Sequence, residues 1–219
     1  MTRSRGCRWV AAGVAVAAVG VYWRIFTPWQ QRWGATDGEV AGPLPGDDLV
    51  AEPAVQTTRA ISVAAPAAAV WPWIAQLGAD RGGFYSYDWL ENLFGLGIHS
   101  ADRIVEDWQT RRVGDLVHAD ARGRGGWYVM DVRPDDVLVL KMGDMKLGRP
   151  AERHEGIGWE FLWTFAVREE ANGSTRLVVR ERVGFANSRV KLLLTPLGPV
   201  GFVMTRRMLA GVKSRAESA

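Results

Sequence analysis

The stretch "GWEFLWTFAVREEANGSTRLVVRERVGF", residues 158–185, holds two apolar runs on either side of a short turn sequence. Both runs are rich in aromatic and β-branched residues, which are typical of strands. Asn172 and Gly173 lie between them, and this pair favours a tight hairpin because both positions accept a positive φ. The stretch therefore predicts two antiparallel strands, Trp159–Arg168 and Thr175–Phe185.

Side-chain alternation divides this hairpin into an apolar face and a charged face, since successive residues of a strand point to opposite sides. The apolar face carries Trp159, Phe161, Trp163, Phe165, Val167, Leu177, Val179, Val183 and Phe185. Arg176, Arg180 and Arg182 occupy the opposite row. We expect the hairpin to wall a large apolar interior.

The rest of the folded part reads as one strand, two short helices, further strands and a long final helix. The helices are expected from Pro66 to Gly78 and over Tyr87–Phe94. The other expected strands are Thr57–Val63, Asp102–Glu106, Asp115–Ala119, Gly126–Val132 and Val137–Met142. After Pro196 and Pro199 an apolar stripe at helical spacing predicts the last helix, with members Val203, Met204, Met208, Leu209 and Val212. This order is typical of an α+β fold in which the final helix covers the concave face of an antiparallel sheet.

The N-terminal residues 1–26 are predicted to be a membrane anchor. The run from Trp9 to Trp23 contains no charged residue and follows several arginines. A bilayer span needs about 20 apolar residues, so the run must extend through Phe26 with Arg24 at the interface. A cleaved signal peptide is the alternative, but the aromatic end of the run suits an anchor better than a cleavage site. The excess of arginine before the run places the folded domain on the non-cytoplasmic side of a single-pass protein.

Residues 27–55 are predicted to be an extended linker. The stretch "ATDGEVAGPLPGDDLVAEP", residues 35–53, is rich in Gly, Pro and Asp and has no apolar period. Residues 56–219 then form the folded domain.

Several separated blocks resemble the SRPBCC superfamily of helix-grip proteins, which includes START lipid-transfer domains, birch-allergen-like proteins and polyketide cyclase/dehydrase-like proteins. The blocks are "VWPWIAQLGADRGGFYSYDWLENLFGLGIHSADRI" (70–104), "VGD" (113–115) and "FVMTRRMLAGVKSRAE" (202–217). The resemblance covers about residues 57–216. It implies a curved antiparallel sheet wrapped around the C-terminal helix, with a cavity for hydrophobic ligands, but it implies no reaction.

Metal, cofactor and nucleophile chemistry have little support. His99, His118 and His154 lie in separate segments, and Cys7 is the only cysteine. A zinc site needs three or four converging ligands, and neither an H-E-x-x-H nor a G-x-S-x-G motif occurs. We therefore predict no metal and no cofactor. A formal net charge of only +3 also disfavours a nucleic-acid partner.

The aromatic stretch "DRGGFYSYDWLENLFG", residues 80–95, has three possible roles: a catalytic loop, a nucleic-acid stacking platform, or a gate over an apolar pocket. Acidic side chains within it disfavour phosphate, and no nucleophile lies nearby. We favour the gate, with Phe84, Tyr85 and Trp89 touching the ligand. The alternative is that these rings only anchor the short helices to the sheet.

Glu181 is the notable polar residue, because it lies in the apolar row of its strand. It either faces the cavity as an acid or pairs with an arginine, and we favour the pair because inward carboxylates are rarely unpaired. We expect a non-catalytic carrier or sensor of a hydrophobic small molecule or lipid. The alternative is a cyclase/dehydrase-like enzyme that uses Glu181 or Tyr85. The expected ligand contacts are Phe84, Tyr85, Trp89, Tyr128, Phe161, Trp163, Phe165, Glu181, Met204 and Met208.

Overall fold

The fold is that of a computed structural model, which describes residue 20 and residues 22–218. Residues 1–19 and 21 of the predicted membrane segment therefore lie outside the described residues. Within the described part, no helix has the length and apolar character that crossing a bilayer requires.

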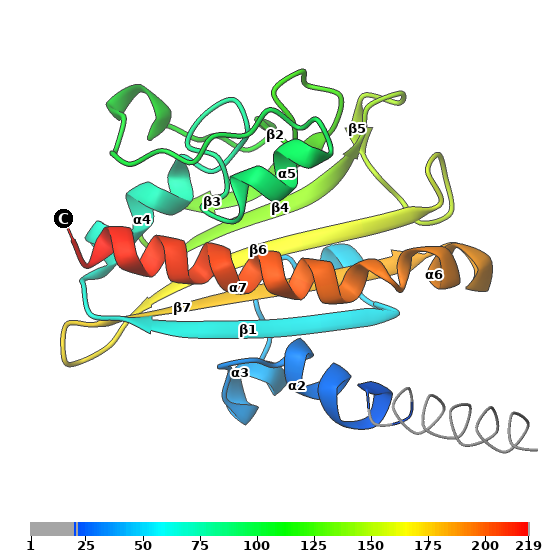
Figure 1. The fold of residues 1–219 in the computed structure, drawn as a ribbon, viewed down its shortest axis with the longest axis horizontal. Helices are drawn as coiled ribbons and strands as arrows, with labels where there is room; N and C mark the ends of the chain where they lie inside the picture. Colours follow the sequence, from blue (N-terminus) through cyan, green and yellow to red (C-terminus); the bar gives the residue numbers. More distant parts are fainter. Residues whose placement is uncertain (1–19, 21, 219) are drawn as a thin grey trace, which may run out of the picture.

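The core of the fold is a seven-stranded antiparallel sheet against which the long C-terminal helix packs (Figure 1). The strand order is β1-β7-β6-β4-β3-β2, and β5 pairs with the end of β4. The strands are β1 (Val55–Val63), β2 (Leu116–His118), β3 (Gly126–Arg133), β4 (Val137–Asp144), β5 (Arg149–Pro150), β6 (Trp159–Glu169) and β7 (Thr175–Phe185). Two short helices, α4 (Ala67–Ala75) and α5 (Asp88–Leu93), follow β1. The predicted α+β fold class is confirmed.

The β6–β7 hairpin has the register that its alternation predicts, from Trp159 opposite Phe185 to Glu169 opposite Thr175. Gly173 in the turn has φ 78°, a left-handed conformation that glycine adopts without strain. Phe165, Leu177 and Val179 are fully buried on the inner face. The hairpin therefore forms the central wall of the interior.

The C-terminal helical segment is divided at Pro196 into α6 (Ser188–Leu194) and α7 (Leu197–Ala216). Proline lacks the amide hydrogen that would continue the α6 hydrogen bonds. Met208, Leu209 and Val212 face the sheet and are buried, whereas Val203 of the predicted stripe is exposed. The buried residues of α7 therefore include Phe202 and Thr205 of its first half, but most of them lie in its C-terminal half.

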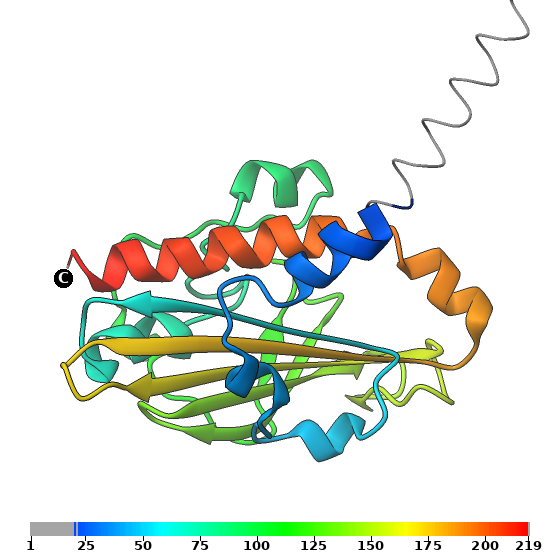
Figure 2. The same ribbon diagram turned by 90° about the horizontal axis from the view of Figure 1, so that it is seen from below.

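Residues 35–51, which we call the outer strap, lie on the face of the sheet opposite α7 (Figure 2). The structure shows short helices here instead of the predicted extended linker. The strap contains α3 (Asp37–Ala41) and the 3-10 helix η2 (Asp47–Val50), and before it come the π-helix η1 (Tyr22–Phe26) and α2 (Thr27–Gln31).

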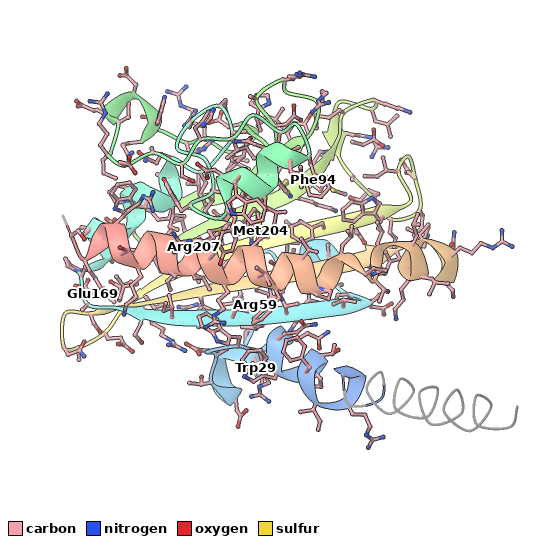
Figure 3. The ribbon with its side chains drawn as sticks, in the orientation of Figure 1. Trp29, Arg59, Phe94, Glu169, Met204 and Arg207 are labelled. Carbon is pink, nitrogen blue, oxygen red and sulfur yellow. The ribbon has the colours of Figure 1, made fainter. Side chains whose placement is uncertain are left out.

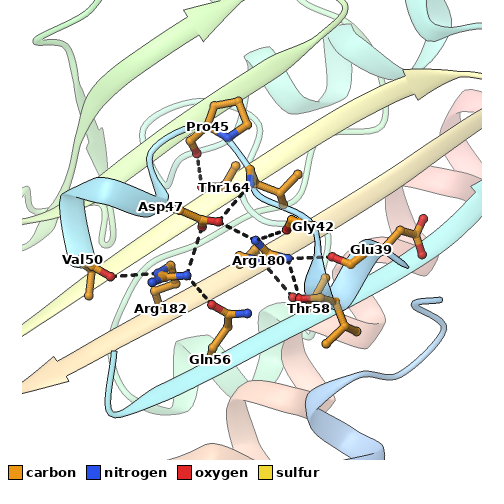
Figure 4. Close-up of polar contacts among 12 residues, drawn as sticks. Glu39, Gly42, Pro45, Asp47, Val50, Gln56, Thr58, Thr164, Arg180 and Arg182 are labelled. Atoms are coloured by element: carbon orange, nitrogen blue, oxygen red, sulfur yellow. Dashed lines mark hydrogen bonds and ion pairs between the residues drawn. The ribbon is translucent and has the colours of Figure 1, made fainter. Parts of the chain in front are cut away.

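The arginine row of β7 holds the outer strap in place (Figure 4). Arg180 donates hydrogen bonds to the backbone carbonyls of Gly42 and Glu39 and forms an ion pair of 2.6 Å with Asp47. Arg182 donates to the carbonyl of Val50. Buried arginines need hydrogen-bond acceptors. The acidic and carbonyl groups of this polar segment supply them, so the segment packs against the sheet.

The strand predicted at Asp102–Glu106 is absent from the structure, which has a loop there followed by the 3-10 helix η3 (Glu106–Trp108). The fully buried Gln76 side chain replaces a neighbouring strand, because it donates to the carbonyl of Arg103 and accepts from the amide of Val105. Once these backbone groups are satisfied by a side chain, the segment does not need a β-ladder.

Candidate functional site

An aromatic cluster on the inner face of the sheet is the candidate site. Trp163 of β6 lies at its centre, with its ring centroid 5.4 Å from that of Trp127 and 4.8 Å from that of Phe165. Phe84 and Phe161 complete the cluster, each with its ring centroid 6.1 Å from that of Trp163. The structure therefore brings three predicted residues of β6 together with Phe84 from the predicted gate.

Trp127 of β3 belongs to this cluster, although sequence reasoning proposed its neighbour Tyr128 instead. Tyr128 lies in the opposite row of β3, paired in register with Lys141, whose side chain bonds to the strap carbonyl of Leu49. Tyr128 therefore belongs to the outer face. Alternation along Gly126–Arg133 was the missed signal, since adjacent residues of a strand cannot both face inward.

Two indole N–H groups of the cluster are buried without a hydrogen-bond partner among the described residues. They are Nε1 of Trp127 and Nε1 of Trp163. An indole N–H can only donate, and leaving a buried donor unpaired costs about 1–3 kcal/mol. The cluster thus combines a large apolar surface with two donors that can meet an acceptor of a bound molecule.

Tyr85 lies elsewhere in the interior than the aromatic cluster. It packs against the backbone of Gly211 on α7. Its φ of 56° is unusual for a residue other than glycine, and its amide donates a 3.1 Å hydrogen bond to Ser100 Oγ. The ring lies edge-on to Trp73 and under the guanidinium of Arg215. Burial raises the pKa of the Tyr85 phenol well above its usual value, so the phenol stays neutral.

Glu181 is paired with an arginine, as we favoured from the sequence. Its Oε2 accepts hydrogen bonds of 2.9 Å from Arg59 Nη1 and from Thr57 Oγ1 of β1. Its Oε1 accepts a 2.8 Å bond from Thr205 Oγ1 of α7. Both carboxylate oxygens are therefore used to join β7, β1 and α7.

Glu181 and Tyr85 meet α7 at different places. Glu181 contacts Thr205, whereas Tyr85 contacts Gly211. Six helical residues correspond to about 9 Å along the axis. The two acid candidates of the enzyme hypothesis are therefore not brought together.

The remaining predicted contacts have different positions. Trp89 is 68% exposed on α5 and contacts the ring of Tyr87 rather than the cluster. On α7, Met208 is buried, and Met204, labelled in Figure 3, is half-buried. Of the predicted gate residues, Phe84 and Tyr85 are therefore buried, whereas Trp89 on α5 faces outward.

Two open clefts of the described part lie away from the aromatic cluster. A cleft of about 490 Å³ lies beside the C-terminal end of α7, with a mixed polar and apolar lining of Trp73, Asp102, Arg103, Ile104, Ser214, Arg215 and Ser218. A smaller one of about 190 Å³ lies beside the outer strap. Neither cleft is lined by a residue of the aromatic cluster, and Phe84, Trp163 and Phe165 of that cluster are buried.

Comparisons with known proteins give a likeness of fold. No protein family and no curated protein matches the chain. A solved structure from Mesorhizobium loti is 11% identical and covers 75% of this chain and 98% of its own, with a TM-score of 0.44. DynU16, from the dynemicin biosynthetic locus, is 15% identical and covers 74% of this chain and 48% of its own, with a TM-score of 0.44. A protein from Arthrobacter aurescens is 15% identical over 76% of this chain and 88% of its own, again with a TM-score of 0.44. At these low identities and TM-scores the likeness carries no argument for a family, a ligand or an activity.

Proposed function

We propose that the domain binds a hydrophobic small molecule or lipid between the inner face of its sheet and α7. The observation that carries this proposal is the pair of buried, unpartnered indole N–H groups of Trp127 and Trp163 within the aromatic cluster. Binding sites for such molecules are mostly apolar, with a few placed polar groups that fix the orientation of the ligand. The donors favour a ligand that carries an oxygen acceptor.

The donors also contribute to the free energy of binding. An acceptor on the ligand removes the cost of the unpaired N–H groups, about 1–3 kcal/mol for each. The ligand enters by displacing the half-buried rings of Phe161 and Trp127, with α5 as the gate above them. The exposure of Trp89 and Leu93 on α5, and of Phe94 at its C-terminal end, supports this role.

We further propose attachment to a membrane through residues 1–26, with the domain on the non-cytoplasmic side. The support is the sequence pattern of basic residues followed by an uncharged apolar run. Alkaline carbonate washing of membranes that contain the full chain tests this. The chain is expected to stay in the pellet, and its release would overturn the anchor.

The cyclase/dehydrase-like alternative has no observation in its favour. A cyclase needs an acid and a base within reach of one substrate. Glu181 is engaged by Arg59 and two threonines, and Tyr85 lies about two helical turns further along α7.

The ligand proposal is tested with two matched tryptophan substitutions in the full chain. The wild type, Trp163→Phe and Trp89→Phe are incubated with a total bacterial lipid extract and repurified, and the bound molecules are quantified by mass spectrometry. Trp163→Phe removes a buried donor but keeps an aromatic ring, whereas Trp89→Phe makes the same change on the surface.

The wild type and Trp89→Phe are expected to retain the same oxygen-containing hydrophobic molecule. Trp163→Phe is expected to retain about tenfold less, which corresponds to the loss of one hydrogen bond. A wild type that retains nothing, or an equal loss in both variants, would overturn the proposal.

A further inference from the structure

The α6–α7 junction exposes large apolar side chains. Leu192 and Leu193 of α6 are 75% and 76% exposed. Leu197, Val200 and Val203 on the first half of α7 are also exposed. Contiguous exposed apolar surface of this kind marks an interaction site.

The η1–α2 segment extends this surface on the neighbouring side of α7. Ile25, Phe26 and Trp29 are exposed. The rings of Phe26 and Trp29 have centroids 6.3 Å and 5.3 Å from that of Phe202, a buried residue in the first half of α7. Figure 2 shows η1 and α2 alongside the start of α7, on the side of the sheet away from the outer strap. We call the exposed side chains of η1–α2, α6 and the first half of α7 the apolar face.

The charged residues of the segments that carry the apolar face, η1–α2, α6 and α7, are all basic. No Asp or Glu occurs between Glu181 and Glu217, although the segment contains several arginines and lysines. Arg189 and Lys191 of α6 and Arg24 of η1 form no ion pair within the described residues. Exposed leucines and aromatic rings beside unpaired bases are typical of helices that lie in the interface of an anionic bilayer.

The position of the face in the chain points to the same occupant. The uncharged run of residues 9–23 leads directly into η1, so a membrane segment there would bring the bilayer to the edge of the apolar face. We propose that the apolar face lies on the surface of a bilayer that contains anionic lipid. This contact is made by α2, α6 and the first half of α7 together with Ile25 and Phe26 at the end of the anchor, and it is separate from the interior ligand site.

The test measures the depth of single labelled positions in the full chain. In a Cys7→Ser background, which removes the only native cysteine, Leu193→Cys or Glu169→Cys is labelled with the fluorophore NBD. Figure 3 labels Glu169 at the end of the molecule opposite to α6, where it is the matched exposed control. The proteins are reconstituted in phosphatidylcholine vesicles with or without phosphatidylserine, and quenching by doxyl-labelled lipid is recorded.

The label at 193 is expected to shift to shorter wavelength and to be quenched by doxyl lipid, while the label at 169 shows neither change. Replacing Arg189 or Lys191 with Ser should lower the ratio of docked to undocked domain about fivefold for each base in phosphatidylserine vesicles, with an unchanged melting temperature.

Two results would overturn the proposal. A chain that sediments with vesicles but has an unquenched label at 193 is held only by its N-terminal segment. A blue-shifted but unquenched label, together with a doubled mass in light scattering, would show instead that the face pairs two copies of the chain. The ligand-retention assay with Trp163→Phe is a separate measurement, and neither of these results changes its outcome.

Discussion

The contact between Gly211 and Tyr85 gives the most direct test of how α7 sits on the fold. A Cβ added at Gly211 would lie 2.8 Å from the Tyr85 Cβ and closer still to its carbonyl oxygen. The obstacle is mainly backbone, in a residue already held at a positive φ, so a change of rotamer cannot relieve it. Overpacking costs about 1–3 kcal/mol, and replacing a helical glycine with alanine returns up to about 1 kcal/mol. We expect Gly211→Ala to lower the free energy of unfolding by about 1–2 kcal/mol.

Gly201 in the same helix is the matched control, because a Cβ there meets no atom within 4 Å. Gly201→Ala should raise the free energy of unfolding by about 0.5–1 kcal/mol through helix propensity alone. A change of 1 kcal/mol moves the melting temperature of a chain of this size by about 2–4 °C. Circular dichroism melting of the full chain in mild detergent should therefore show shifts of opposite sign. Equal shifts in the same direction would refute the close contact.

The outer strap provides two further predictions. Arg180→Ala removes the buried guanidinium that donates to Asp47 and to several strap carbonyls. It should cost about 3–5 kcal/mol in urea unfolding, against about 0.5 kcal/mol or less for the exposed Arg168→Ala. Similar losses in both variants would contradict the role of the buried guanidinium. The hydrogen bond from Arg176 lowers the pKa of Glu39, so its contribution is complete above the unfolded carboxyl pKa of about 4.3 and is lost as the pH falls through the folded value. Glu39→Gln should therefore flatten the acid limb of the melting temperature against pH, and an unchanged acid limb would argue against it.

The sheet could be predicted where local pattern determines structure. Strict alternation and the Asn172–Gly173 turn fix the β6–β7 hairpin, because a one-residue slip would turn its apolar side chains outward. The break before α7 follows from Pro196 alone. These signals lie within a few residues of the structure that they produce.

Features that depend on distant partners were not predictable in the same way. Gln76 keeps residues 102–106 out of the sheet through bonds that no local pattern encodes. The outer strap looked like a linker because its composition is polar, yet the arginine row of β7 needs acceptors on that face. Arginines that alternate with apolar residues on a central strand were a signal that an acidic segment must cover them.

The two sides of α7 connect the interior to the apolar face. Met208, Leu209 and Val212 cover the sheet from the second half of the helix, whereas Val200 and Val203 point outward from the first half. Suppose that the exposed side chains of the first half of α7 rest on a bilayer. A displacement of α7 then exposes the aromatic cluster to lipid rather than to water. A hydrophobic ligand that moved along this route would not need to cross the aqueous phase, where each buried CH₂ costs about 0.8 kcal/mol to expose. The unpaired indole donors would then favour the molecules of the bilayer that carry an oxygen acceptor over plain hydrocarbon.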